Sequence, residues 1–138
     1  MLHKHLQAFL NLSGKDKLLF FEALFFLFLA KVMLLILPFR HCLKFVKTGE
    51  FAGQPDLIQL TDLRYAIGRA GRLTFRKNIC LVQSFAARWM LARRKINSEL
   101  FIGAMLNENK VLTAHAWLTC QNLEIVKKAD NYKILLKI

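Results

Sequence analysis

Two side chains in the second half of the sequence, Cys80 and His115, have the types needed for nucleophilic acyl transfer. A cysteine thiolate attacks carbonyl carbon, and an imidazole transfers the protons that this reaction requires. Asn78 is a favourable helix N-cap, and apolar residues then recur at helical spacing from Leu81, which predicts a helix over residues 79–95. Cys80 would lie in its first turn, where free N–H groups and the positive end of the helix dipole favour a thiolate. The competing interpretation is a small buried cysteine, which is common inside cells.

His115 falls on a predicted strand. Residues 100–106 form a short apolar run, 107–110 favour a turn, and 111–120 alternate with the two-residue period of a strand, so a hairpin is expected. One face of the second strand is the better core face, with Leu112, Ala114, Ala116, Leu118 and Cys120. His115 and Trp117 are on the other face, turned toward a surface or cleft. The small alanines beside His115 leave room for it to act as a base.

A carboxylate that orients the imidazole would complete a catalytic triad. Gln121 and Asn122 favour a two-residue turn, after which residues 123–130 would pair antiparallel with 111–120. The expected pairs are Cys120 with Leu123, Thr119 with Glu124, Trp117 with Val126, His115 with Lys128 and Thr113 with Asp130. In this register Asp130 is diagonally adjacent to His115 on the same face. Asp130 is therefore the predicted third member, and Glu124 is the alternative.

The elements that position these groups follow from helix and loop signals. Ser13 and Asp16 precede an apolar run and predict a helix start, and Pro38 predicts its end near Leu37. Residues 48–55, with two glycines and a proline, predict a loop before a further helix over residues 56–71. We expect a single α+β domain, 1–138. Its N-terminal part, 1–55, is helical, and its catalytic part, 56–138, packs the nucleophile helix on a small antiparallel sheet.

Composition limits the other functions to consider. The 138 residues carry a net charge of +12, and no acidic residue stands between Asp62 and Glu99. Nine basic residues fall in that window: Arg64, Arg69, Arg72, Arg76, Lys77, Arg88, Arg93, Arg94 and Lys95. Such a window attracts nucleic acid, acidic lipids or an acidic peptide. No recognised nucleic-acid-binding motif is present, however, so no nucleic acid is expected as a partner.

The three cysteines are Cys42, Cys80 and Cys120, an odd and widely spaced set that predicts neither a disulfide scaffold nor a metal site. We therefore expect a cytoplasmic protein without a metal or cofactor. The apolar segment 18–37 is long enough to span a bilayer, but Glu22 and Lys31 interrupt it and disfavour a spanning helix. The segment is expected to be buried on most sides, against the rest of the protein or a partner, and peripheral membrane contact is a further option.

The run Cys80-Leu81, Ser84, Arg93-Arg94, 100–103 (Leu-Phe-Ile-Gly) and 114–117 (Ala-His-Ala-Trp) resembles the transglutaminase-like leader peptidases of lasso peptide biosynthesis. The resemblance covers about residues 56–138. It implies a cysteine protease that removes the leader from a ribosomally made precursor peptide, with Cys80 as nucleophile and His115 as base. It also implies a transglutaminase- or papain-like core, a separate leader-recognition protein and an ATP-dependent lasso cyclase as partners.

The sequence leaves several alternatives for the site residues and for the function. Asp130 matches the acidic member less securely than the other two, Trp117 is a candidate substrate contact, and Thr119 stands where the family would place an acid. The same Cys and His could serve an acyltransferase, which passes the acyl group to an amine instead of water. A basic nucleic-acid-binding module and a non-catalytic scaffold are the remaining alternatives.

Overall fold

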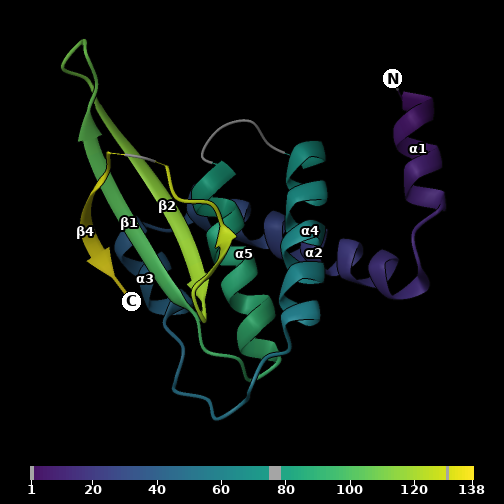
Figure 1. The fold of residues 1–138 in the computed structure, drawn as a ribbon. Coiled ribbons are helices and arrows are strands. Elements are labelled where there is room, and N and C mark those ends of the chain that lie inside the picture. The colour runs from purple at the N-terminus through teal and green to yellow at the C-terminus, as the bar shows by residue number, and fades with distance from the viewer. Residues whose placement is uncertain (1, 75–78, 130) are drawn as a thin grey trace.

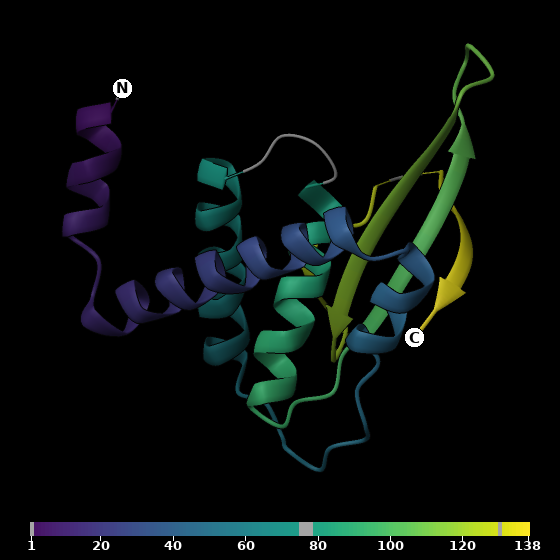
Figure 2. The same ribbon diagram turned by 180° about the vertical axis from the view of Figure 1, so that it is seen from behind.

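The computed structural model describes residues 2–74, 79–129 and 131–138. The five helices stand on one side of a four-stranded antiparallel sheet of order β3-β2-β1-β4, with α5 and α4 next to the sheet and α2 across the far side of these two helices (Figures 1 and 2). The helices are α1 (Leu2–Leu10), α2 (Gly14–Ile36), α3 (Phe39–Val46), α4 (Leu57–Thr74) and α5 (Ile79–Arg93). The strands are β1 (Glu99–Leu106), β2 (Leu112–Cys120), β3 (Leu123–Val126) and β4 (Lys133–Lys137). The predicted α+β class is confirmed.

Helix α2 begins and ends where the sequence predicts. The Ser13 hydroxyl oxygen accepts a hydrogen bond from the backbone N–H of Asp16 at 3.2 Å, and the helix ends two residues before Pro38. One side packs on α4 and α5 through Ala23, Leu27 and Ala30, each with no exposed surface. The opposite side is exposed, so the described residues bury this segment on one side only, and its burial against a partner stays a prediction. Helices α4 and α5 cover that one side, as Figure 2 shows.

Three elements, α1, α3 and β4, were not predicted from the sequence. Helices α1 and α3 are short, and α3 follows Pro38, which acts as its N-cap residue with fixed φ. Strand β4 is an edge strand with mostly exposed side chains, so its sequence lacks the alternation of a half-buried strand. Strand β4 depends on pairing with β1, which is distant in sequence, whereas α1 contacts the neighbouring helix α2.

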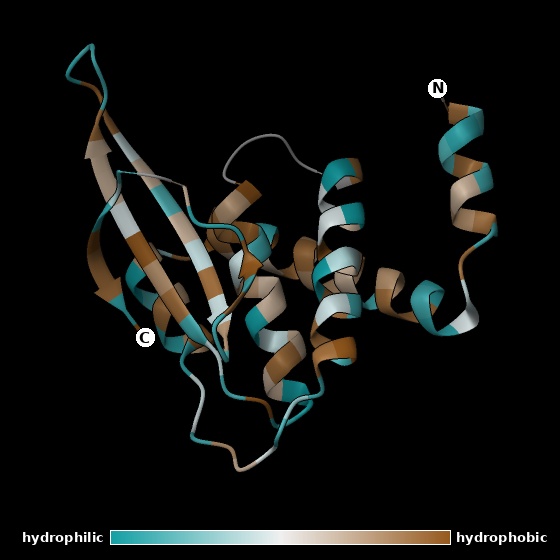
Figure 3. Ribbon diagram, in the orientation of Figure 1, coloured by the Kyte–Doolittle hydropathy of each residue, from teal (hydrophilic) through white to brown (hydrophobic). Residues whose placement is uncertain are grey.

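The core lies between α5 and the inner face of the sheet, the face that α5 covers. Phe85, Met90 and Leu91 on α5 pack there with Leu100 and Leu118 of the two central strands. Figure 3 shows hydrophobic residues concentrated in these layers and along α2, and hydrophilic ones at the tip of the hairpin that joins β1 and β2. Predicted core residues Leu118, Cys120 and Ala116 are buried, whereas Leu112 and Ala114 are exposed because β2 extends beyond the helices.

Buried Arg88 joins three parts of the chain. Its Nε donates to the Val46 carbonyl at 2.7 Å, and its Nη1 donates to the carbonyls of Ser98 at 3.1 Å and Ile138 at 2.9 Å. The guanidinium is 4% exposed, and burial lowers its pKa from the ordinary value. One residue of the basic window therefore holds α3, β1 and β4 together and is not available to an external partner.

The turn and first pairs of the β2–β3 hairpin form as predicted, but the register then shifts. Gln121 and Asn122 adopt positive φ of 48° and 68°, as a two-residue turn requires, and Cys120 pairs with Leu123. A bulge follows, so Val126 pairs with Leu118 and not with Trp117. The extra residue allows Ile125 and Val126 to be buried together, at 3% and 5% exposure.

After Val126 the chain leaves β3 and crosses to β4 at the other edge of the sheet. We call the described residues between β3 and β4, 127–129 and 131–132, the crossover segment. It passes over the outer face, the one turned away from α5 (Figure 1). The predicted strand pairing of His115 with Lys128 is therefore wrong, since β3 ends before it. The predicted pairing of Thr113 with Asp130 falls on a residue outside the described part of the chain.

Candidate active site

Cys80 is the second residue of α5, in its first turn as predicted. It is half-buried, whereas Cys42 and Cys120 are buried. Its carbonyl oxygen accepts a hydrogen bond of 2.7 Å from the hydroxyl of Ser84, which has no exposed surface. This bond secures the turn that carries the thiol. The predicted N-cap, Asn78, lies outside the described residues.

His115 is a half-buried residue in the middle of β2, on the outer face. Its Nε2 lies 2.9 Å from the carbonyl oxygen of Lys127 in the crossover segment. A carbonyl oxygen only accepts, so Nε2 is the protonated nitrogen and Nδ1 of the neutral ring keeps its lone pair. The Tyr132 ring lies 5.3 Å away, between ring centroids. The imidazole is thus held with one defined nitrogen available as a base.

An aromatic layer surrounds His115. The Trp117 ring stacks on Phe101 with centroids 5.4 Å apart, and Lys128 of the crossover segment lies over it at 5.5 Å. Gly103 pairs with His115 across the strands, and a Cβ atom there would lie 3.0 Å from Trp117 ring carbons. Trp117 is only 2% exposed. In this arrangement it supports the histidine's surroundings, and substrate contact through it would require the crossover segment to move.

The acidic member of the predicted triad is the least defined. Asp130 lies outside the described residues. Glu124 pairs with Thr119, four residues along β2 from His115, a separation of about 13 Å at the rise of a strand. Glu124 therefore does not orient the imidazole here. The partner that does so is the Lys127 carbonyl, which sequence patterns could not indicate because every residue has one.

The nucleophile and base are not in hydrogen-bond contact in the described part of the chain. Helix α5 packs on the inner face, while the His115 ring lies on the outer face. The described ladder pairs β3 only with Leu118, Thr119 and Cys120 of β2, so at His115 this side of β2 faces the crossover segment and no strand. Any approach of the Cys80 thiol to the His115 ring therefore passes around this unpaired side of β2.

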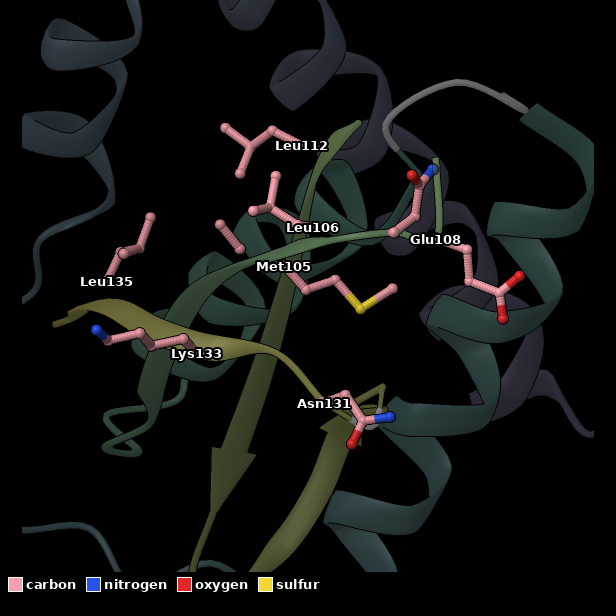
Figure 4. Close-up of a pocket in the computed structure, with 9 residues that line it drawn as sticks. Met105, Leu106, Glu108, Leu112, Asn131, Lys133 and Leu135 are labelled. Atoms are coloured by element: carbon pink, nitrogen blue, oxygen red, sulfur yellow. The ribbon is translucent and has the colours of Figure 1, made fainter. Parts of the chain in front are cut away.

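A pocket of about 680 Å³ lies beside the crossover segment, between β4 and the β1–β2 hairpin. Figure 4 shows its wall of Met105, Leu106, Leu112 and Leu135, with Asn131, Lys133 and Glu108 at its polar side. Met105 pairs with Thr113, whose hydroxyl lies 3.4 Å from that of Tyr132. Leu106 and Leu112 pair with each other on the face of the sheet opposite His115, so most of this wall lies away from the histidine, and Met105 alone of the labelled wall residues on β1 and β2 shares its face. The apolar wall of the pocket suits an extended peptide.

Internal contacts engage part of the basic window. Arg94 binds Glu22 with an Nη2–Oε2 distance of 2.6 Å, Arg93 binds the same carboxylate at 3.2 Å, and Arg88 is buried. On α4, Arg64 and Arg72 remain exposed, while Arg69 lies over the Tyr65 ring. Among the described residues of the window, the exposed cations left for an acidic ligand are therefore Arg64 and Arg72 on α4, together with Arg93 and Lys95 at the end of α5. Among the described residues, no group of three or more His, Cys, Asp or Glu could hold a metal ion.

The family comparison agrees with this fold. The model of the transglutaminase-like superfamily matches residues 25–136, which include Cys80, His115, helices α3 to α5, strands β1 to β3 and parts of α2 and β4. The chain belongs to the transglutaminase-like superfamily, which includes cysteine proteases and acyltransferases. No curated protein and no solved structure gave a match.

Proposed function

We propose that this chain is a cysteine peptidase that removes the leader from a ribosomally made lasso precursor peptide. The observation that carries the proposal is the combination, within a transglutaminase-like domain, of Cys80 in the first turn of α5 and His115 held on β2 by its Nε2. The resemblance of residues 56–138 to lasso leader peptidases supports the choice of substrate. A separate leader-recognition protein and the lasso cyclase are the proposed partners.

In the proposed mechanism the Cys80 thiolate attacks the scissile carbonyl carbon, and a C–S bond forms. N–H groups of the first turn of α5 would stabilise the oxyanion. Nδ1 of His115, which has accepted the thiol proton, donates it to the leaving amine, and the C–N bond breaks. Neutral Nδ1 then takes a proton from water, which hydrolyses the thioester and releases the acid and the thiol.

This mechanism requires Cys80 and His115 to meet. Catalytic hydrogen bonds are commonly long in free enzymes and shorten in the substrate complex. Here the required approach is around the side of β2 that the crossover segment occupies. We propose that the precursor and the leader-recognition protein displace this segment. The segment contacts His115 through Lys127, Thr113 through Tyr132, and Trp117 through Lys128. The free chain would then be less active than the assembled complex.

The experiment is cleavage of the precursor peptide in the presence of the leader-recognition protein, with products read by mass spectrometry. The wild type should release the intact leader, and Cys80→Ala should release none. Cys120→Ala is the matched control, because this buried cysteine is on the inner face and has no proposed catalytic role. Undiminished cleavage by Cys80→Ala, or its loss only in Cys120→Ala, would overturn the assignment.

An acyltransferase is the second candidate, since the superfamily includes both activities. It would form the same thioester but pass the acyl group to an amine. Adding a primary amine to the reaction distinguishes the two. A peptidase yields mainly the free acid, whereas an acyltransferase yields mainly the amide.

A further inference from the structure

The exposed side of α2 carries an unusually large apolar surface. Seven residues, which we call the apolar stripe, are between 41% and 74% exposed: Leu18, Phe21, Phe25, Phe28, Leu29, Leu35 and Ile36. At about 100° per residue they fall within an arc of about 120°, opposite the buried Ala23, Leu27 and Ala30. The helix is therefore apolar on both sides, with only one side covered by this chain.

The apolar surface continues onto the neighbouring helices. Phe9 of α1 contacts Phe20 and Phe21, with ring centroids 5.0 and 5.9 Å away, so α1 is joined to the start of the stripe. At the other end, Phe39 and Phe45 of α3 are 44% and 63% exposed. Figure 2 shows α2 running across the helical side of the molecule between α1 and α3. Exposed apolar surface of this extent marks an interaction site.

The charges around this surface are mostly positive. Residues 2–47 hold seven basic side chains and two acidic ones, Asp16 and Glu22. Arg93 and Arg94 neutralise Glu22 within the protein. The basic members are Lys4, Lys15, Lys17, Lys31, Arg40, Lys44 and Lys47. By the same helical geometry Lys17 lies at one margin of the stripe, where its stem would cover apolar surface while its ammonium group reaches anionic headgroups. Glu22, neutralised within the protein, lies at the other margin.

We propose that this side of the protein binds an anionic lipid bilayer, with α2 lying in the plane of the interface. The opposite side of α2 forms part of the core, so lipid cannot surround the helix without unfolding the domain. This excludes a spanning orientation for the folded chain, although α2 is the one described helix long and apolar enough to cross a membrane. Only 28% of its most apolar stretch is buried inside the protein.

A partner helix fits these observations less well. A coiled-coil partner covers one narrow seam and selects flanking charges of both signs. Here the apolar surface extends over three helices, and the side chains of residues 2–47 are basic far more often than acidic. A broad aromatic and leucine surface in a basic region is the chemistry of an interfacial helix. The arrangement also keeps the sheet's outer face, with His115 and the crossover segment, on the side away from the lipid (Figures 1 and 2).

Flotation with vesicles tests this proposal on the full chain. Phosphatidylcholine vesicles with and without phosphatidylglycerol would be compared at low and high salt. The wild type should float with the anionic vesicles, less so at high salt, and weakly with the neutral ones. The double variant Phe25→Gln, Phe28→Gln should lose at least about tenfold in partition, since two aromatic anchors are removed while glutamine retains helix propensity.

The matched control is Leu112→Gln, which removes an equally exposed apolar residue, 69% exposed, from the hairpin distant from α2. It should bind vesicles like the wild type. Circular dichroism and thermal unfolding would establish that each variant is folded. Absence of vesicle binding by the wild type, or equal binding by the double variant, would overturn the proposal. Salt-independent binding to neutral vesicles would also contradict it, and a stable dimer of the wild type without vesicle binding would assign the stripe to a protein interface instead.

Discussion

Nε2 of His115 lies 2.9 Å from the carbonyl oxygen of Lys127, twelve residues later in the chain. This bond fixes the tautomer of the imidazole and also ties the crossover segment to the outer face of the sheet. A single hydrogen bond therefore connects the proposed base, His115, to the segment that covers it. Release of the segment would free Nε2 as well as the edge of β2 that the proposed reaction uses.

Glutamine at position 115 separates these two roles. In His115→Gln the side-chain amide can still donate to the Lys127 carbonyl, but it cannot accept and return a proton at catalytic rates. We expect a loss of at least about 100-fold in leader cleavage, with thermal stability close to the wild type. His115→Ala should lose both activity and part of the stability. Precursor cleavage and thermal unfolding of both variants would test this, and an active His115→Gln would remove the histidine from the mechanism.

The three cysteines should differ in reactivity. Burial raises the pKa of the Cys42 and Cys120 thiols, so they hold little thiolate near neutral pH, and both side chains are shielded. Half-buried Cys80 should therefore react with iodoacetamide at least about tenfold faster. The alkylation of Cys42 and Cys120 should become appreciable only at higher pH. Peptide mapping after timed alkylation measures the order, and unfolding in denaturant, which should equalise the three, provides the control.

Gly103 should resist substitution. A Cβ atom there would lie 3.0 Å from the Lys133 carbonyl oxygen and from the Trp117 ring, closer than ordinary contact. We expect Gly103→Ala to lower the free energy of unfolding by about 1–3 kcal/mol, because the ring or β4 must shift. Gly68→Ala is the control, since nothing lies within 4 Å of a Cβ there and alanine favours the helix. Chemical denaturation should show opposite signs for the two variants.

Arg88 is expected to contribute to stability and not to ligand binding. Arg88→Met retains much of the volume but leaves the carbonyls of Val46, Ser98 and Ile138 without this donor. The expected loss is about 3 kcal/mol or more. Arg93→Met removes an exposed ion pair to Glu22 and should cost about 1 kcal/mol or less. Equal losses in urea denaturation would contradict this distinction.

Local sequence patterns were enough to predict several parts of the site. Apolar residues at helical spacing predicted the helix that carries Cys80, two-residue alternation predicted the strand that carries His115, and both elements are confirmed. The turn at Gln121 and Asn122 is equally local, because it needs only residues that tolerate positive φ. The α2 start at Ser13 follows from a cap three residues long.

The register of β3 against β2 after that turn could not be predicted from such patterns. A strictly alternating strand would place Trp117 opposite Val126, but burial of both Ile125 and Val126 favours a bulge, and one added residue displaces every later pair. Which side of α2 this chain covers was unpredictable for a similar reason. Its apolar residues surround the helix, and only the placement of α4 and α5 determines which side they cover.

The sequence by itself determined the chemistry available to this protein: a thiol at a helix start, an imidazole on a strand, and an apolar helix in a basic region. Periodicity and capping act within a few residues, so these features can be derived without a fold. Only the tertiary structure decided that His115 bonds to the Lys127 carbonyl, that Arg88 is internal, and that the apolar stripe is left uncovered. Those outcomes depend on contacts between segments far apart in the chain, which bulges and packing set and which no local pattern encodes.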